Sequence, residues 1–152
     1  MNETQVTRVF DVPRELVWKA LTEPEHFAQW FGTPPFTTPV STITMDVRPG
    51  GASRATMVHE SAGTKLPFLG TYREVVEPEL LVHTLEDPSD PSNPDVELLT
   101  YTLTDLGGKT ELRYHQAGHL PEEQYPLIEQ GVSGFYDRLE AHLAELSGEA
   151  SA

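Results

Sequence analysis

Apolar and polar residues alternate with a period of two along seven short segments of the chain. Successive side chains of a β-strand point to opposite faces of a sheet, so this alternation predicts strands with one buried face. The turns between them are rich in Gly and Pro, as at Pro49-Gly50-Gly51, and such short connections favour antiparallel neighbours. We expect strands at residues 4–10, 41–47, 52–59, 66–76, 80–86, 96–104 and 109–116.

A helical period replaces the alternation between the first two of these strands. The segment 13–21 opens with proline, which suits the first turn of a helix because that turn needs no N–H group there. The segment 22–25, Thr-Glu-Pro-Glu, matches a capping box and predicts the start of a second short helix. Phe27, Trp30 and Phe31 then share one apolar face. Two short helices therefore follow the first strand.

The last thirty residues or so change to a period of three to four, which predicts a single long amphipathic helix. Its apolar positions run from Tyr125 to Leu146, and we expect the helix to end near Gly148. Residues 33–40 and 87–95 each contain three prolines and are typical of loops. No internal repeat interrupts this order, so we expect one domain over residues 1–152.

These elements define an α+β fold in which a curved, seven-stranded antiparallel sheet surrounds the C-terminal helix. One face of such a sheet must be covered, and this helix is the element long enough to cover it. A helix is only about 10 Å wide and does not fill the concave side of a strongly bent sheet. Ser53 and Ala55 are small for inward strand positions, and Gly131 and Gly134 leave space in the helix. The alternatives are an internal cavity and close packing of helix against sheet.

The chain resembles the START/Bet v 1-like (SRPBCC) helix-grip superfamily, and within it the homologues of the activator of the heat-shock-protein-90 ATPase. The resemblance implies a helix-grip fold with a hydrophobic ligand cavity. Members bind lipids, sterols, hormones or polyketides, and some are cyclases or hydrolases. The matching segments are 10–18 (FDVPRELVW), 21–25 (LTEPE), 30–32 (WFG), 46–51 (DVRPGG), 70–75 (GTYREV), 81–84 (LVHT) and the helix from Gly131-Val132 to Arg138-Leu139.

Three positions depart from the family pattern in a way that enlarges the expected cavity. Val132 stands where relatives usually carry Trp, and Ser53 and Ala55 stand where they carry aromatic residues. Each change removes ring volume from an inward position. The loop 87–95 also looks longer than usual, and we expect it to edge the mouth of the cavity.

Composition and charge narrow the classes of partner. The chain has 152 residues, 38% of them hydrophobic, no Cys and a formal net charge of −14. A chain this acidic is repelled by nucleic acids and by anionic membrane surfaces. No signal peptide and no run of about 18 apolar residues is present. We expect a cytoplasmic protein that neither binds nucleic acid nor inserts into a membrane.

The usual catalytic and cofactor motifs are missing from the sequence. The six His residues show no metal-ligand spacing, so we expect no metal. There is no Gly-rich phosphate loop, no Gly-x-Ser-x-Gly elbow and no Cys nucleophile. We therefore expect no cofactor.

His83 is the weak catalytic candidate, because it alternates with Leu81 and Leu85 and so points inward. It is open whether His83 is a general base, a ligand contact or a satisfied core histidine. We expect binding of a small hydrophobic ligand; the alternatives are a cyclase or hydrolase that uses His83 with a Tyr, and a protein-interaction module or homodimer. The expected lining residues are Trp30, Ser53, Ala55, Met57, His83, Leu85, Tyr101, Tyr114, Val132 and Phe135.

Overall fold

A computed structural model describes residues 2–32, 34–90 and 92–151 of the chain. The helices are α1 (Arg14–Thr22), α2 (Pro24–Trp30) and α3 (Tyr125–Ser151), with 3-10 turns at Val40–Thr42 and Glu122–Gln124. The strands are β1 (Glu3–Phe10), β2 (Phe36–Thr37), β3 (Thr44–Met45), β4 (Ala52–His59), β5 (Lys65–Val76), β6 (Leu80–Leu85), β7 (Glu97–Asp105) and β8 (Thr110–Ala117).

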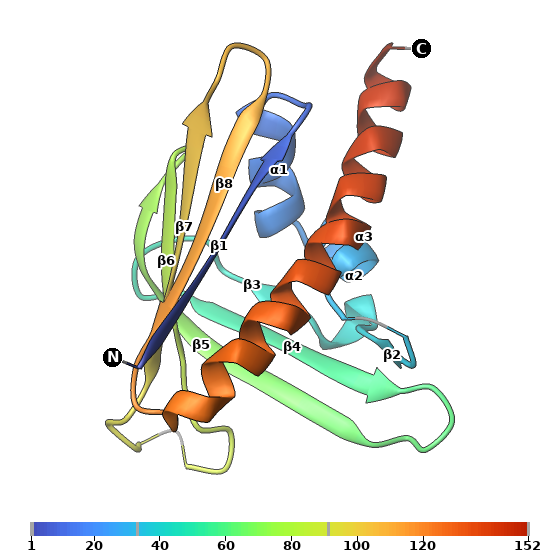
Figure 1. Ribbon diagram of the computed structural model, residues 1–152. Helices are drawn as coiled ribbons and strands as arrows, with labels where there is room; N and C mark the ends of the chain where they lie inside the picture. The colour runs from blue at the N-terminus through green and yellow to red at the C-terminus, as the bar shows by residue number, and fades with distance from the viewer. Residues whose placement is uncertain (1, 33, 91, 152) are drawn as a thin grey trace.

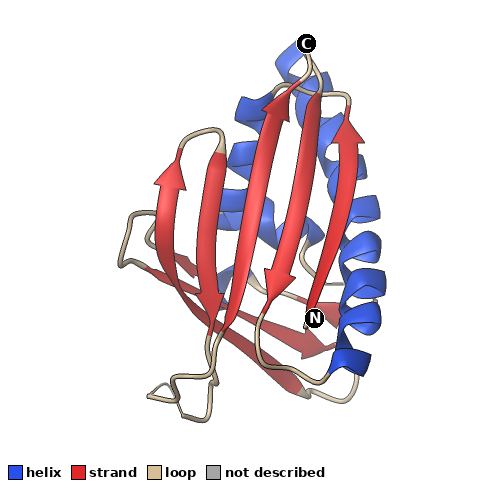
Figure 2. Ribbon diagram, turned by 60° about the vertical axis from the view of Figure 1, so that its left-hand side comes forward, coloured by secondary structure: helices blue, strands red, loops and turns tan. Residues whose placement is uncertain are grey.

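The strands form one curved antiparallel sheet in the order β1-β8-β7-β6-β5-β4-β2, and β3 pairs with β4. The first strand thus pairs with the last, and all helices lie on one side of the sheet (Figures 1 and 2). This arrangement confirms the expected α+β fold, in which the long C-terminal helix lies across the concave face.

The first half of the sheet differs in detail from the expected segments. Only Thr44–Met45 of the segment 41–47 is a strand, because the 3-10 turn Val40–Thr42 occupies its beginning and a turn follows Met45. The expected loop 33–40 contains the two-residue strand Phe36–Thr37, which pairs with the end of β4. Pairings this short leave almost no period-two signal in a sequence.

The capping box expected at 22–25 does not form. Glu23 is the N-cap residue of α2 and its side chain makes no capping hydrogen bond. The Thr22 hydroxyl instead donates to the carbonyl of Trp18, 2.7 Å away in the preceding helix. Pro24 at the first position is what remains of the predicted start signal.

The helix α3 continues to Ser151 and does not end near Gly148. A terminating glycine adopts a positive φ, and Gly148 is not among the glycines that do so. Two arginines hold α3 in place. Arg8 on β1 bonds Asp137, with Nη1 2.7 Å from Oδ1, and Arg138 donates to the carbonyls of Gly32 and Gln29 at the end of α2.

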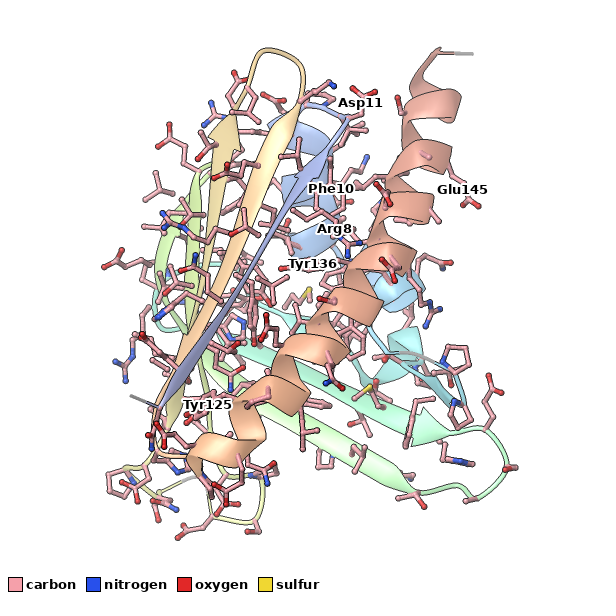
Figure 3. The ribbon with its side chains drawn as sticks, viewed as in Figure 1. Arg8, Phe10, Asp11, Tyr125, Tyr136 and Glu145 are labelled. Carbon is pink, nitrogen blue, oxygen red and sulfur yellow. The ribbon has the colours of Figure 1, made fainter. Side chains whose placement is uncertain are left out.

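The core lies where α1, α2 and α3 pack against the concave face of the sheet. Trp30 is 2% exposed, and its Nε1–H donates to the carbonyl of Ala20 at 2.9 Å, which joins α2 to α1. Tyr136 projects from α3 toward the sheet and makes an edge contact with Phe10, with ring centroids 6.0 Å apart (Figure 3). None of the helices in the described part of the chain is long and apolar enough to cross a membrane.

Candidate ligand cavity

A cavity of about 570 Å³ lies between the concave face of the sheet and α3. It exists because β4 and β5 bend away from the other strands and pass beneath α3, as Figure 1 shows for the two green strands. A Cβ atom added to Gly131 on α3 would meet no atom within 4 Å. The space expected at this glycine is therefore open and is not used for close packing.

Nine of the ten residues expected to line the cavity do so. Met57 lies outside it, although it is buried. The strand β4 runs past the cavity, so that Met57 lies beneath Gly32, where an added Cβ would come within 3.2 Å of its sulfur. The nine expected residues that line it are Trp30, Ser53, Ala55, His83, Leu85, Tyr101, Tyr114, Val132 and Phe135.

Aromatic rings from three elements form the wall near α2. Phe31 follows α2 and lies 5.3 Å from Phe68 on β5 and 5.1 Å from Phe135 on α3, measured between ring centroids. Phe27 stacks on the other side of Phe31 at 4.5 Å. This wall is apolar and offers ring faces and edges to a ligand.

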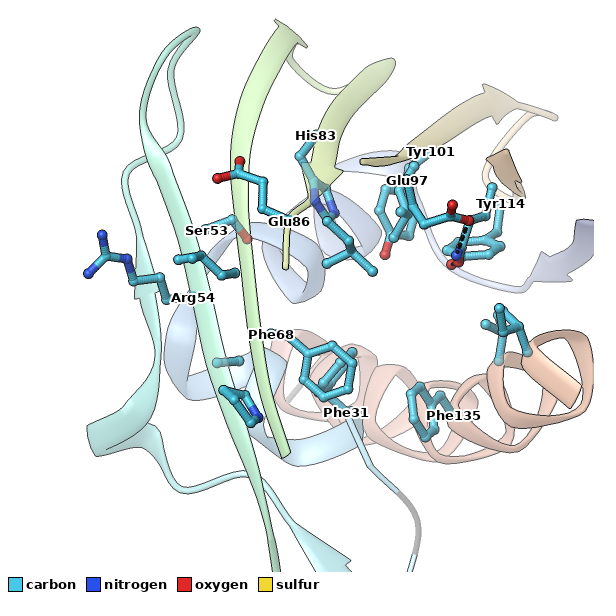
Figure 4. A pocket seen from close by; sticks show the side chains of 18 of the residues that line it. Phe31, Ser53, Arg54, Phe68, His83, Glu86, Glu97, Tyr101, Tyr114 and Phe135 are labelled. Carbon is cyan, nitrogen blue, oxygen red and sulfur yellow. Dashed lines mark hydrogen bonds between the residues drawn. The ribbon is translucent and has the colours of Figure 1, made fainter. Parts of the chain in front are cut away.

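His83 points into the cavity from the middle of β6 (Figure 4). Its ring stacks on Tyr101 with centroids 5.9 Å apart and meets Tyr72 edge-on at 5.8 Å. Nδ1 lies 2.9 Å from the carbonyl oxygen of Thr84. A carbonyl only accepts, so Nδ1 carries the proton and donates. Burial lowers the pKa of His83, and the hydrogen bond to Thr84 only partly opposes this.

Four tyrosines line the cavity, and two of them, Tyr72 and Tyr136, were not among the expected residues. Burial raises the pKa of all four phenols, so they stay neutral. The hydroxyl of Tyr136 is buried and has no hydrogen-bond partner among the described residues. Its position was readable from the sequence, because Tyr136 follows the lining residue Val132 by one helical turn.

Sequence reasoning also missed a buried carboxylate, Glu97, at the end of the cavity nearest the start of α3. Its side chain is 5% exposed. It accepts from Gln116 Nε2 at 3.0 Å, from the Tyr125 hydroxyl at 2.8 Å and from the backbone N–H of His119 at 2.7 Å. Burial raises the pKa of Glu97, but the hydrogen bonds outweigh it and hold the pKa below its ordinary value. The sequence did contain a sign of its position: Glu97 is four residues before Tyr101 on β7, and residues an even number apart on a strand point to the same face.

The mouth of the cavity is acidic. Glu86 accepts from the hydroxyls of Thr71 at 2.7 Å and Thr84 at 2.6 Å. Asp87 and Asp95, at the two ends of the loop 87–95, also line this region. Among the lining residues that the structure describes, the one Lys or Arg side chain is Arg54, which is exposed and points away from the interior (Figure 4).

We expect the state of His83 to make stability depend on pH. Its folded pKa lies below the ordinary 6.5, so below that pH the unfolded chain binds a proton that the folded chain resists. Stability is then full above about pH 6.5 and falls as the pH drops. The facing groups, Tyr72 on β5 and Tyr101 on β7, do not titrate there. Urea midpoints at pH 7 and about pH 5 should differ less in His83→Phe than in wild type; an equal difference in both would contradict this.

No group of three or more His, Asp or Glu in the described part of the chain is arranged to hold a metal ion. The cavity thus presents apolar walls, a neutral imidazole, neutral phenols and, at one end, a satisfied carboxylate. Such a site can bind an apolar molecule and orient it with a few hydrogen bonds.

A curved antiparallel sheet that grips a long C-terminal helix around a cavity defines the helix-grip proteins of the START/Bet v 1-like superfamily. The family described as "Activator of Hsp90 ATPase homolog 1-like protein" matches residues 11–144, and the chain belongs to this family. The expected resemblance is confirmed. No curated protein matched the chain.

Solved structures of bacterial proteins share this fold. A protein from Nitrosomonas europaea is 28% identical, with a TM-score of 0.80 and 97% of each chain covered. A protein from Chromobacterium violaceum is 27% identical, with a TM-score of 0.78 and coverage of 93% of this chain and 96% of that chain. An AHSA1-like protein from Aeromonas hydrophila is 18% identical, with a TM-score of 0.74 over 95% and 94% of the two chains, and shows the fold alone.

Proposed function

We propose that this protein binds an apolar or amphipathic small molecule in the cavity between the sheet and α3. The observation that carries this proposal is the cavity itself, about 570 Å³ of largely apolar space inside a chain of 152 residues. Interiors are normally packed with few voids larger than a water molecule. An open apolar space of this size costs packing energy, which a bound apolar ligand would recover.

Filling the cavity should weaken binding. Val132 faces the cavity from α3 and has open space in front of it, so Val132→Trp should still fold. We expect the neutral dye Nile red to bind wild type with a shifted emission and to bind Val132→Trp at least about tenfold more weakly, a change of about 1.4 kcal/mol.

The matched control is Leu127→Trp, which adds a Trp to α3 at a position that is 60% exposed. It should bind the dye as wild type does. Equal binding by all three proteins would place the dye on the surface and contradict the proposal. Circular dichroism checks that each variant is folded.

Catalysis is the second candidate, and the observation that favours it is the state of His83. Nδ1 of His83 is committed to the Thr84 carbonyl, so the neutral ring leaves the lone pair of Nε2 to take a proton from a bound ligand, as a general base does. Incubation with polyketide-like carbonyl compounds tests this. Turnover by wild type that persists in His83→Ala would remove the mechanism.

A further inference from the structure

The geometry points to an uncharged ligand that carries a hydroxyl group, bound by its oxygen at His83 and the neighbouring tyrosines, with fatty-acid carboxylates excluded. This inference rests on the proposed function and adds the chemical class of the ligand. It follows from three features of the cavity: an acceptor, nearby donors and the signs of the charges.

The acceptor is Nε2 of His83. Because Nδ1 donates to the Thr84 carbonyl, the single proton of the neutral ring sits on Nδ1, and Nε2 carries a lone pair. Nε2 is at the far edge of the ring, which projects into the cavity (Figure 4). The stacked Tyr101 on one side and the edge of Tyr72 on the other fix the direction of the ring. A ligand must donate a hydrogen bond to satisfy this nitrogen.

The donors are phenols. The hydroxyl of Tyr101 points into the cavity toward α3 (Figure 4). The Tyr136 hydroxyl also has no partner among the described residues, but protein atoms enclose it and it does not face the open space. An unpaired hydroxyl in an apolar site costs free energy, so a ligand oxygen that accepts from the Tyr101 hydroxyl relieves that cost. A hydroxyl both donates and accepts, and it fits the imidazole and the phenols together.

The charges oppose an anion. A carboxylate has no proton for Nε2 of His83, and the one Lys or Arg among the described lining residues, Arg54, is exposed at the rim. The lining residue His119 already faces a carboxylate, with Nε2 3.7 Å from Oε2 of Glu97. Glu97, at the end nearest the start of α3, and Glu86, at the mouth, add negative charge. Burial of an unpaired carboxylate is among the costliest changes in a protein interior.

Three compounds that share one naphthalene ring and differ in the group at position 2 test the inference: 2-naphthol, 2-methoxynaphthalene and 2-naphthoate. The first donates and accepts, the second only accepts, and the third is an anion. We expect calorimetric titration at pH 7 to give an affinity for 2-naphthol about tenfold above that for the ether, the effect of one hydrogen bond. The carboxylate should bind at least about a hundredfold more weakly than the alcohol.

Two variants assign the effect to His83. His83→Phe keeps an aromatic ring between Tyr72 and Tyr101 but removes the acceptor, so the preference for the alcohol over the ether should disappear. His115→Phe changes a histidine on β8 that lies outside the cavity and bonds Glu3, and it should keep the preference.

The outcomes separate the two proposals. Equal affinity of wild type for the alcohol and the ether, or binding of the carboxylate as tight as that of the alcohol, would overturn the inference and leave the cavity as a binding site. An unchanged preference in His83→Phe would also overturn it. If none of the three compounds binds, the proposed function fails as well.

Discussion

The Glu97→Ala variant should lose about 3–5 kcal/mol of unfolding free energy, because it removes the acceptor of a buried network. Three donors would be left without a partner: Gln116 Nε2, the Tyr125 hydroxyl and the backbone N–H of His119. These groups join β7, β8 and the start of α3. Urea unfolding at pH 7, followed by circular dichroism, measures the loss.

The matched control is Glu74→Ala on β5, which removes an exposed carboxylate and should change the unfolding free energy by less than about 0.5 kcal/mol. The pH dependence adds a second check. The pKa of Glu97 lies below its ordinary 4.5 in the folded protein, so its contribution is full above pH 4.5 and is lost as the pH falls through the folded value. The gap between Glu97→Ala and wild type should therefore narrow in acid. A gap of the same size at pH 7 and about pH 3 would show that the ionised carboxylate is not what stabilises the network.

The strands that could be predicted from the sequence are those whose alternation spans several residues. The segment expected at 52–59 is β4 residue for residue, because the inward Ala55 and the outward Arg54 have opposite burial. The two-residue strand Phe36–Thr37 could not be predicted in the same way, since two residues do not make a period. Thr44–Met45 was predicted only as part of the longer segment 41–47. The predicted helix end at Gly148 was wrong for a related reason. A glycine is compatible with a helix end, but whether it adopts the positive φ of a terminating residue depends on the surrounding backbone.

The walls of the cavity were predictable to the extent that parity decides which way a side chain points. Parity placed His83, Tyr101 and Tyr114 inward, and the structure has them lining the cavity. The same rule applied to Glu97 would have placed it inward beside Tyr101, but an inward carboxylate is credible only when its donors are known. Those donors come from β8 and the start of α3. Their meeting is a tertiary fact that no local pattern contains.

The prediction for Met57 failed in the opposite way. The strand face on which it lies was predicted correctly, but its position along the strand is beyond the cavity. It shares an inward face with Ser53 and Ala55, yet it pairs with Leu66 in the part of the β4–β5 hairpin that extends beyond the cavity. Where a cavity ends along a strand depends on where the sheet bends. We expect that bend to depend on Gly70.

We expect Gly70→Ala to be as damaging as the loss of Glu97, for a steric reason. A Cβ atom at position 70 would lie 2.0 Å from the backbone oxygen of Thr84 on β6 and 3.3 Å from Nδ1 of His83. In the next residue, the N–H of Thr71 donates to the Thr84 hydroxyl, and further along the pair the register of β5 with β6 shifts between Tyr72 and Glu74. The glycine lets the two backbones approach where β5 turns beneath α3. The strands must move apart to admit a methyl group, which we expect to cost at least about 3 kcal/mol.

Gly131→Ala makes the same chemical change on α3 with the opposite expected sign. Its Cβ meets no atom within 4 Å, and Ala is favoured over Gly inside a helix by about 1 kcal/mol, so this variant should be more stable than wild type. Urea midpoints of both variants test the pair. Nile red binding provides a second measurement, because a shift of β5 at Gly70 also moves His83 and the cavity wall. If Gly70→Ala unfolds at the midpoint of wild type and binds the dye equally well, the close approach of β5 and β6 is not what shapes the cavity, and the bend must arise elsewhere in the sheet.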